Sequence, residues 1–411
     1  MPADSRPRRL AVAALTVALA SLLAACVQNP NSVFHSRTDV NRDVDSLFKL
    51  LIWLGSIVFV FTEALLLWAL IRYRSRPGRA HEPDQVHGNT KLEILWTIIP
   101  AVVLAIIAVP TVQTIFRTQG RPRADALQVE VIGHQWWWEF RYPQYSVTTA
   151  NELYLPIGRT VNLALHTHDV LHSFWIPALA GKRDLVNNRT NHLWFTADST
   201  TSDVFNGYCA EFCGVSHANM RFRAYAVAPE QFASWIAHQQ TPATNPLTPA
   251  ASSAAPPSPA PPSAQARAPV QAGFIAFARD SMPDHAMPRT PTPAGLTFDT
   301  TLVGDAARGG TLVATGACIG CHTIKGVPTM LAQVGPDLTH VGSRLTIAGG
   351  LFPNDARHLA LWIKNARAMK PGVFMQTLGK GQYDPVTKMT LSVGLTDQQI
   401  ADMVAYLQTL K

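Results

Sequence analysis

Two short segments of the sequence carry residues that bind metals and redox cofactors. The first places two cysteines, a histidine and a methionine within twelve residues: Cys209, Cys213, His217 and Met220. Cysteine and methionine sulfur together with imidazole nitrogen suit copper in an electron-transfer role. The second, Cys318-Ile-Gly-Cys321-His322, has the spacing of the covalent c-type haem attachment motif. The sequence therefore predicts two redox centres in one chain.

The copper segment needs more nitrogen ligands than His217 alone supplies. His172, in Asp169-Val-Leu-His172-Ser-Phe-Trp-Ile-Pro177, is the best upstream candidate. In a cupredoxin-like sandwich one ligand comes from an early loop and the others from a late loop, which is the order found here. A mononuclear blue-copper site uses one cysteine, whereas two thiolates can bridge a pair of copper ions. The alternative is a disulfide between Cys209 and Cys213, which leaves His217 and Met220 at ligand spacing by coincidence.

The sequence assigns no metal-binding role to three other histidines or to the remaining cysteine. Three histidines in strand-like segments are not expected to bind metal: His134, His166 and His168. The fifth cysteine, Cys26, follows a basic head and an apolar run, so residues 1–25 are predicted to be a signal peptide. This segment resembles a bacterial lipoprotein signal, in which the cysteine receives lipid. The alternative is an uncleaved membrane anchor. No cysteine is left over for a structural disulfide.

The net charge does not imply nucleic-acid binding. The formal charge is +7, and +5 once Arg6, Arg8, Arg9 and Asp4 of the signal are removed. Much of the rest lies in one short loop, residues 72–79, between two apolar segments. Its four arginines favour the cytoplasmic side of a membrane.

Residues 40–118 are predicted to form a transmembrane hairpin. The two apolar segments, 47–71 and 92–116, are each long enough to cross a membrane as a helix. Both outer flanks of the hairpin then face the periplasm, in agreement with an exported Cys26. Glu63 is an acid inside the first span, and it indicates a face turned toward a partner. The alternative is that snorkelling or protonation accommodates it on the lipid side. Thr90-Lys-Leu-Glu93 predicts a capping box at the start of the second span.

The periplasmic part divides into a β-rich unit and a helical unit. Residues 124–240 contain short alternating runs that predict a sandwich, followed by a helix at 231–239. Residues 241–269 are rich in proline, alanine and serine and predict an extended tether. From residue 302 to 411 the pattern is helical, with caps at Asp305, Asp355 and Thr396. Residues 270–301 between them are either an extra helix on the helical unit or a loosely held extension.

Three segments together resemble subunit II of cytochrome c oxidase with its binuclear CuA centre: residues 209–220, residues 169–177, and Gly133-His-Gln-Trp136-Trp-Trp138. The resemblance implies that Cys209 and Cys213 bridge two coppers and that His172 and His217 complete them. It also implies that Met220 is a weak ligand, and that Glu211 supplies its carbonyl oxygen to copper and its side chain to a magnesium ion. Trp136 would be the point of electron input. The competing reading places Trp136 in the core, because the three tryptophans alternate faces in a strand.

The helical unit resembles the cytochrome c domains fused to this subunit, through Lys370-Pro-Gly-Val-Phe-Met375 and Gly335-Pro-Asp-Leu-Thr-His340. The resemblance implies haem thioethers at Cys318 and Cys321 and axial ligation by His322. A methionine on the other side of the iron raises its potential. Met375 is preferred over Met330, Met369 and Met389, although Gln376 stands where the family usually has proline.

These features predict a multidomain membrane protein with a two-helix transmembrane hairpin, a cupredoxin-like β-sandwich and an all-α cytochrome c domain. The resemblance implies the electron-input subunit of a haem-copper oxidase in the bacterial cytoplasmic membrane. Its partners would be oxidase subunits I and III, membrane lipid, and a donor such as a cytochrome c or a cytochrome bc complex. By the same resemblance Glu93 lies at the mouth of a proton-uptake path. The rival is a free membrane electron carrier. Nitrous oxide reductase lacks such a hairpin, and quinol oxidase lacks the copper ligands.

Overall fold

The structure is a computed structural model of the full chain. It describes residues 13–14, 16–17, 20–21, 31–74, 87–120, 124–198, 203–243 and 282–411. The few described residues of the predicted signal peptide are helical. Cys26, the second half of the arginine-rich loop, and most of the predicted tether lie outside the described residues.

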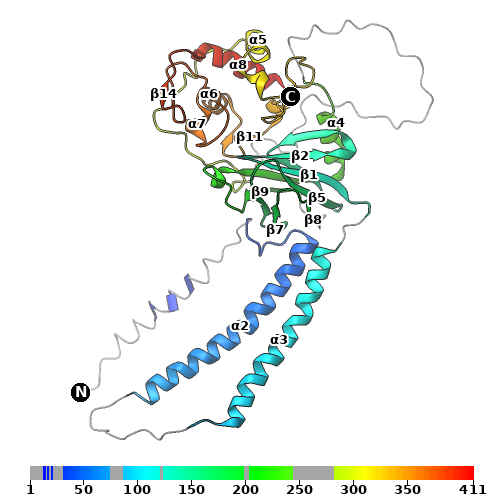
Figure 1. Cartoon of the computed structure of the whole chain (residues 1–411), viewed down its shortest axis with the longest axis vertical. Helices are drawn as coiled ribbons and strands as arrows, with labels where there is room; N and C mark the ends of the chain where they lie inside the picture. The colour runs from blue at the N-terminus through cyan, green and yellow to red at the C-terminus, as the bar shows by residue number, and fades with distance from the viewer. Residues whose placement is uncertain are drawn as a thin grey trace, which may run out of the picture.

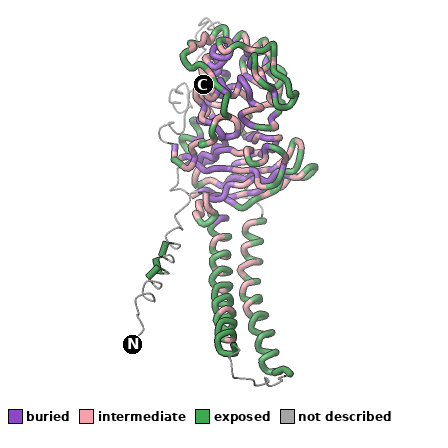
Figure 2. The backbone as a smooth tube through the Cα atoms, turned by 90° about the vertical axis from the view of Figure 1, so that its left-hand side faces the viewer, coloured by how far each residue is buried: buried purple, intermediate pink, exposed green. Residues whose placement is uncertain are grey.

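Two long helices form a hairpin on one side of the molecule (Figure 1). They are α2 (Asp39–Arg72) and α3 (Thr90–Gln119), with 34 and 30 residues. At 1.5 Å per residue they extend about 51 and 45 Å, enough to cross a bilayer. Their apolar side chains are exposed along nearly the whole length (Figure 2). Such surfaces are stable in lipid and unfavourable in water.

The predicted cap of the second helix is wrong by one residue. Asn89, not Thr90, is the N-cap of α3, and its side chain accepts a hydrogen bond from the Leu92 amide at 3.3 Å. The Glu93 carboxylate in turn accepts from the Asn89 amide at 3.1 Å. Glu93 therefore has the predicted capping role, with Asn89 as its partner.

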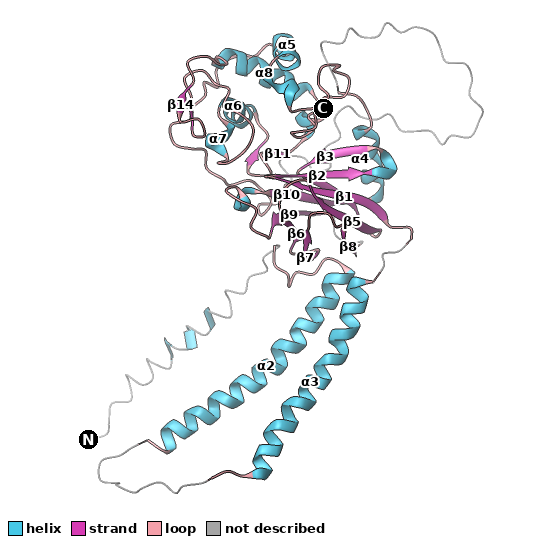
Figure 3. Ribbon diagram, viewed as in Figure 1, coloured by secondary structure: helices cyan, strands magenta, loops and turns pink. Residues whose placement is uncertain are grey.

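Ten strands form the β-sandwich of the sandwich domain (residues 124–240) (Figure 3). One sheet has the order β3-β2-β1-β5-β8 and the other β4-β10-β9-β6-β7. The strands are β1 (Leu127–His134), β2 (Trp137–Tyr142), β3 (Val147–Ala150), β4 (Glu152–Pro156), β5 (Thr160–Thr167), β6 (His172–Ile176), β7 (Ala180–Leu185), β8 (Asn191–Thr196), β9 (Asp203–Cys209) and β10 (Arg221–Val227). Helix α4 (Pro229–Gln239) follows β10.

Aromatic side chains between the two sheets fill the core of the sandwich domain. Trp138 meets Phe174 edge-on at 5.5 Å between ring centroids, and Phe174 stacks on Phe222 at 4.9 Å. Gly207 of β9 lies under the Phe222 ring, where an added Cβ would be 2.1 Å from Cζ. The core therefore holds β6 and β9, which carry His172 and Cys209, and β10, which begins directly after Met220.

The C-terminal domain (residues 302–411) is mostly helical. Its main helices are α5 (Ala306–Thr315), α6 (Ala356–Lys364), α7 (Ala366–Met369) and α8 (Asp397–Thr409). Asp305, Asp355 and Thr396 cap α5, α6 and α8 as predicted. The short pairs β11 (Thr346–Ile347) with β12 (Phe352–Pro353) and β13 (Tyr383–Asp384) with β14 (Met389–Thr390) complete it. The predicted fold class is confirmed.

The C-terminal domain lies on the sandwich domain, on the side away from the long helices (Figures 1 and 2). Residues 282–301, whose role the sequence left undecided, contact both domains. Met282 and Ala286 belong to the apolar core of the sandwich domain, whereas Leu296 belongs to that of the C-terminal domain. The first residues of the predicted tether also pack, since the Ala243 amide donates to the Lys325 carbonyl at 3.1 Å.

Candidate metal and electron-transfer site

Three strands bring the predicted copper ligands together. His172 is the first residue of β6, and Cys209 is the last residue of β9. The ligand loop (residues 210–220) then carries Cys213, His217 and Met220 back to β10. β6 and β9 are neighbours in one sheet, with Phe174 opposite Cys209. One early ligand and a late cluster is the arrangement expected from the sequence.

The donor atoms lie at distances that a shared metal requires. The two sulfurs of Cys209 and Cys213 are 3.8 Å apart, so no disulfide joins them, because a disulfide bond is about 2.05 Å long. His172 Nδ1 is 3.8 Å from the Cys209 sulfur. On the other side the Cys213 sulfur is 3.6 Å from His217 Nδ1 and 3.8 Å from Met220 Sδ. Metal bonds to sulfur and nitrogen of roughly 2.0–2.3 Å span such pairs.

The donor atoms form two groups that share the sulfur atoms of Cys209 and Cys213. One group ends at His172, which is fully buried, and the other at His217 and Met220. The Glu211 carbonyl oxygen lies 3.3 Å from the Cys209 sulfur. A soft donor set with a sulfur pair at its centre fits two copper ions better than it fits a hard cation.

The thiols of Cys209 and Cys213 have pKa values shifted in opposite directions. The hydrogen bond from Cys213 lowers the pKa of Cys209 to about 3, and bonds from His172 and the backbone add to the effect, although burial opposes it. The same bond and the burial raise the pKa of Cys213. One thiolate therefore forms readily, and a bound metal would displace the second proton.

Asp169 orients His172, a role that the sequence analysis did not assign. Its Oδ1 lies 2.8 Å from His172 Nε2, and a carboxylate only accepts, so Nε2 donates and Nδ1 keeps a free lone pair toward Cys209. Burial lowers the pKa of His172, but Asp169 and Cys209 outweigh it and raise the pKa overall. The Asp169 carboxylate also accepts from the Gln135 amide at 2.7 Å. An acid three residues before a candidate histidine ligand was the available sequence signal.

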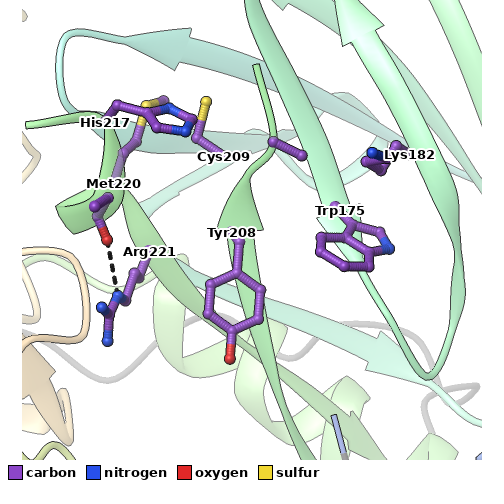
Figure 4. Close-up of a pocket in the computed structure, with 9 residues that line it drawn as sticks. Trp175, Lys182, Tyr208, Cys209, His217, Met220 and Arg221 are labelled. Carbon is purple, nitrogen blue, oxygen red and sulfur yellow. Dashed lines mark hydrogen bonds between the residues drawn. The ribbon is translucent and has the colours of Figure 1, made fainter. Parts of the chain in front are cut away.

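A cavity of about 330 Å³ opens beside the ligand loop (Figure 4). Cys209, His217 and Met220 line one end, while Tyr208, Trp175 and the cations Lys182 and Arg221 line the rest. The Arg221 side chain donates to the Ala218 carbonyl at 3.0 Å, which braces the loop. The ligand cluster is therefore reachable from this side.

His134, which the sequence analysis did not expect to bind metal, has its Nε2 2.9 Å from the Glu139 carboxylate.

Trp136 is not in a strand, although the sequence analysis placed the three tryptophans in one, and it is buried, as its competing packing reading expected. β1 ends at His134 and β2 begins at Trp137, so Trp136 lies in the turn between them. It is only 7% exposed. Its indole N–H donates to the Cys213 carbonyl at 3.0 Å, and its ring stacks on Phe374 of the C-terminal domain at 6.1 Å between centroids. Trp136 thus contacts the ligand loop and the loop that carries Met375.

The haem motif lies at the end of α5. Cys318 and Cys321 are free thiols, and burial raises the pKa of Cys318 to about 11. His322 Nδ1 donates to the Pro336 carbonyl at 2.8 Å, which leaves Nε2 as the lone-pair nitrogen available to iron. An added Cβ on Gly335 would be 2.7 Å from the His322 ring, so this glycine allows the segment of residues 335–336 to lie close against the ring. These residues fit a covalently bound haem.

The four candidate axial methionines differ in their surroundings. Met330 and Met369 are buried in the apolar core of the C-terminal domain. Met389 is 66% exposed in β14. Met375 is half-buried in the loop that follows α7, next to Phe374. The assignment of Met375 as the second axial ligand of the haem iron therefore stays a prediction.

Comparisons with known proteins match three regions of the chain. Residues 33–114 match the transmembrane domain of cytochrome c oxidase subunit II, and residues 146–227 match its periplasmic domain. Residues 306–411 match cytochrome c. The first two matches include the long helices and much of the sandwich, and the third is the C-terminal domain.

Individual relatives agree with these matches. Cytochrome c oxidase subunit 2 of Alkalihalophilus pseudofirmus is 32% identical, over 87% of this chain and 84% of that protein. The same subunit of Bacillus sp. strain PS3 is 31% identical, over 82% of this chain and 80% of that protein. The solved periplasmic domain of subunit II of cytochrome oxidase of Bradyrhizobium japonicum is 30% identical, covering 29% of this chain and 95% of its own, with a TM-score of 0.27. The chain belongs to the cytochrome c oxidase subunit II family, a component of the haem-copper terminal oxidases, and carries a C-terminal cytochrome c domain.

Proposed function

We propose that this chain is the electron-input subunit of a haem-copper terminal oxidase. It takes electrons from an external donor, such as a cytochrome c or a cytochrome bc complex, and passes them through its c-type haem and a binuclear CuA centre to subunit I. Subunit I then reduces oxygen to water, coupled to proton pumping. The observation that carries the proposal is the pair of sulfurs, 3.8 Å apart, flanked on each side by an imidazole, in the domain that contacts the cytochrome c domain.

The copper ligands divide between the two ends of the sulfur pair. Cys209 and Cys213 would hold the copper pair, with His172 at one end. His217 and Met220 lie at the other end, and the Glu211 carbonyl is a further weak ligand. When bound, the copper pair supplies a one-electron acceptor whose charge is spread over two metals and two sulfurs. The protein supplies a buried, preshaped donor set held by three strands.

The haem ligands come from two loops of the C-terminal domain. Cys318 and Cys321 form the thioethers, His322 is the axial ligand fixed by the Pro336 carbonyl, and Met375 is the opposite ligand. Trp136 is the electron-input residue of the sandwich domain, because its indole joins the Cys213 carbonyl to the loop that ends at Met375.

Further partners follow from the family. Subunit I receives the hairpin of α2 and α3, with Glu63 as an acid on the shared face, and subunit III completes the complex. The exposed Glu211 carboxylate contributes to a magnesium site at the boundary with subunit I. The chain lies in the bacterial cytoplasmic membrane with both domains outside, and lipid on Cys26 adds a second anchor.

Glu93 is proposed to lie at the entrance of a proton path into subunit I, in addition to its capping role. Glu93→Gln keeps an oxygen that can accept from the Asn89 amide, so α3 should remain intact. We expect slower proton uptake by the oxidase in vesicles while copper and haem contents are unchanged. Normal uptake in this variant would remove Glu93 from the path.

Metal and optical analysis of the purified chain tests the main proposal. We expect two coppers and one c-type haem per chain, and co-purification with a larger haem-containing subunit. A chain that binds no copper, or one atom, excludes the CuA assignment. A chain that binds both cofactors but purifies alone from the membrane favours a free electron carrier.

A further inference from the structure

The loop that carries the proposed haem ligand Met375 is also the part of the C-terminal domain that contacts Trp136. This 370–375 loop begins with Lys370, whose Nζ donates to the Trp136 carbonyl at 2.7 Å and to the Ala348 carbonyl at 3.2 Å. Four residues later the Phe374 ring stacks on the Trp136 indole, with 15° between the ring planes. Both the backbone and the ring of Trp136 are therefore held by one loop.

Lys370 is an unusual residue to find at this contact. Its side chain is 2% exposed, and among the residues that the structure describes no carboxylate forms an ion pair with it. Burial lowers the pKa of Lys370 to about 7. A buried ammonium is unfavourable unless hydrogen bonds compensate it, and here one of its two acceptors belongs to the other domain. The bond to Trp136 exists only while the two domains are docked.

Gly372 allows the same loop to approach the indole closely. Its φ is +92°, a conformation that glycine adopts without strain. An added Cβ would lie 3.0 Å from Cζ3 of Trp136 and 3.2 Å from Cβ of Val215 in the ligand loop. A methyl group at this position would be strained by the positive φ and would require the Trp136 ring or Val215 to shift by a few tenths of an ångström.

Other buried polar contacts fix the same docked position. Arg223 of β10 donates to the Ala286 carbonyl at 2.8 Å and to the Gly350 carbonyl at 3.0 Å. The Glu152 carboxylate of β4 accepts from the Leu345 amide at 3.1 Å. These donors and acceptors are buried and directional, so they specify one orientation of the C-terminal domain.

We propose that Lys370 is a positioning residue that holds the haem-bearing loop on Trp136, so that the copper site receives electrons from its own docked cytochrome c domain. This inference rests on the proposed function. In the step one electron leaves the reduced haem iron and enters the oxidised copper pair, with no bond broken and no proton moved. Because the docked loop covers Trp136, a second cytochrome must reduce the haem and does not reach the indole directly.

Lys370→Met in the intact oxidase tests the proposal, because methionine keeps much of the side-chain volume and removes the donors. The matched control is Lys380→Met, an exposed lysine of the same domain. The first readout is hydrogen exchange of the Leu345 amide, which bonds to Glu152 across the contact and exchanges when the domains separate. Losing a bond from a charged donor should weaken docking about tenfold and so speed this exchange about fivefold. The control should leave it unchanged.

The second readout is the rate at which a photoreduced haem passes its electron to copper within the chain. We expect Lys370→Met to slow this step about twofold or more, with the haem and copper spectra unchanged. Unchanged exchange, an unchanged transfer rate, or loss of the methionine-ligated haem spectrum would each overturn the positioning role. If the wild-type oxidase shows no transfer from haem to copper, the proposed function fails instead, and the exchange data still report whether Lys370 holds the domains together.

Discussion

The hydrogen bond between Asp169 and His172 gives the most direct test of the copper site. The Asp169 carboxylate accepts from His172 Nε2 at 2.8 Å and so directs Nδ1 toward Cys209. Asp169→Asn keeps an oxygen acceptor but removes the charge. Asp169→Ala removes the acceptor altogether. The two variants separate the contribution of the charge from that of the orientation.

The magnitude follows from the kind of bond that is lost. A hydrogen bond to a charged group contributes about 1.5–3 kcal/mol and a neutral one about 0.5–1.5 kcal/mol. Asp169→Asn should therefore weaken copper binding by about 1–1.5 kcal/mol, roughly five- to tenfold. Asp169→Ala should weaken it by roughly 10- to 150-fold, in the range seen for residues that orient metal-bound histidines.

Copper affinity is measured by titration of the purified chain against a competing chelator at pH 8. Because Asp169 and Cys209 raise the pKa of His172, protons compete with copper at this imidazole, and all variants are therefore compared at the same pH. Asp184→Asn, an exposed acid on β7, is the matched control. If both Asp169 variants bind copper as tightly as the control, or if the alanine variant binds more tightly than the asparagine variant, the orienting role is refuted.

Three further variants test other parts of the structure. Met375→Leu should abolish the low-spin haem spectrum and lower the haem potential, while Met389→Leu should change neither. Glu152→Gln should remove a pH dependence of stability. Burial raises the pKa of Glu152 to about 7, so the native carboxyl keeps its proton where the unfolded one loses it. The stability of the wild-type protein should therefore fall by about 3 kcal/mol at most as pH rises from about 4.5 to 7. Gly309→Ala should destabilise the C-terminal domain by about 1–3 kcal/mol or more in urea, because the new Cβ would lie 1.9 Å from the Asp402 carbonyl oxygen.

Each variant has its own contradicting result. Retention of the wild-type haem spectrum and potential by Met375→Leu would show that another group binds the iron. For Glu152, urea midpoints at pH 5 and pH 8 are compared with those of Glu230→Gln, an exposed acid. An equal fall in both variants would assign the pH dependence to other groups. Thr311→Ala, on the exposed face of α5, is the control for Gly309, and equal stability of these two variants would rule out the close helix contact.

Local sequence patterns were sufficient for most of the elements and for the donor set. Apolar length predicted α2 and α3, and short alternating runs predicted the β-rich unit at residues 124–240. Capping side chains at Asp355 and Thr396 marked the helix starts. The candidate copper donors, which the structure brings together, were selected because cysteine, histidine and methionine have few other reasons to occur at such spacing. These signals depend on residues within a few turns of one another.

Contacts between distant residues were not predictable in the same way. Lys370 and Trp136 are more than 200 residues apart, and nothing near either one indicates that an ammonium meets a backbone carbonyl. The strand expected through Trp136 fails because β1 ends at His134 and β2 begins at Trp137, which leaves Trp136 in the turn between them. Residues 282–301 lack an apolar period, yet the Ala286 carbonyl accepts from Arg223. Every residue has a backbone carbonyl, so the sequence does not indicate which carbonyl will accept a hydrogen bond from a distant side chain.

The covalent link and the docked contact act together. A link of the kind predicted for residues 241–269 supplies an effective concentration of about 1 mM, so an intrinsic docking constant of only about 0.1 mM would keep roughly nine-tenths of the chains docked. Tight intrinsic binding is therefore unnecessary, and a few hydrogen bonds to backbone carbonyls suffice. The same arithmetic makes the contact sensitive: a tenfold weaker bond at Lys370 would leave about half of the chains docked. A single buried lysine can then determine how often the haem loop lies on Trp136.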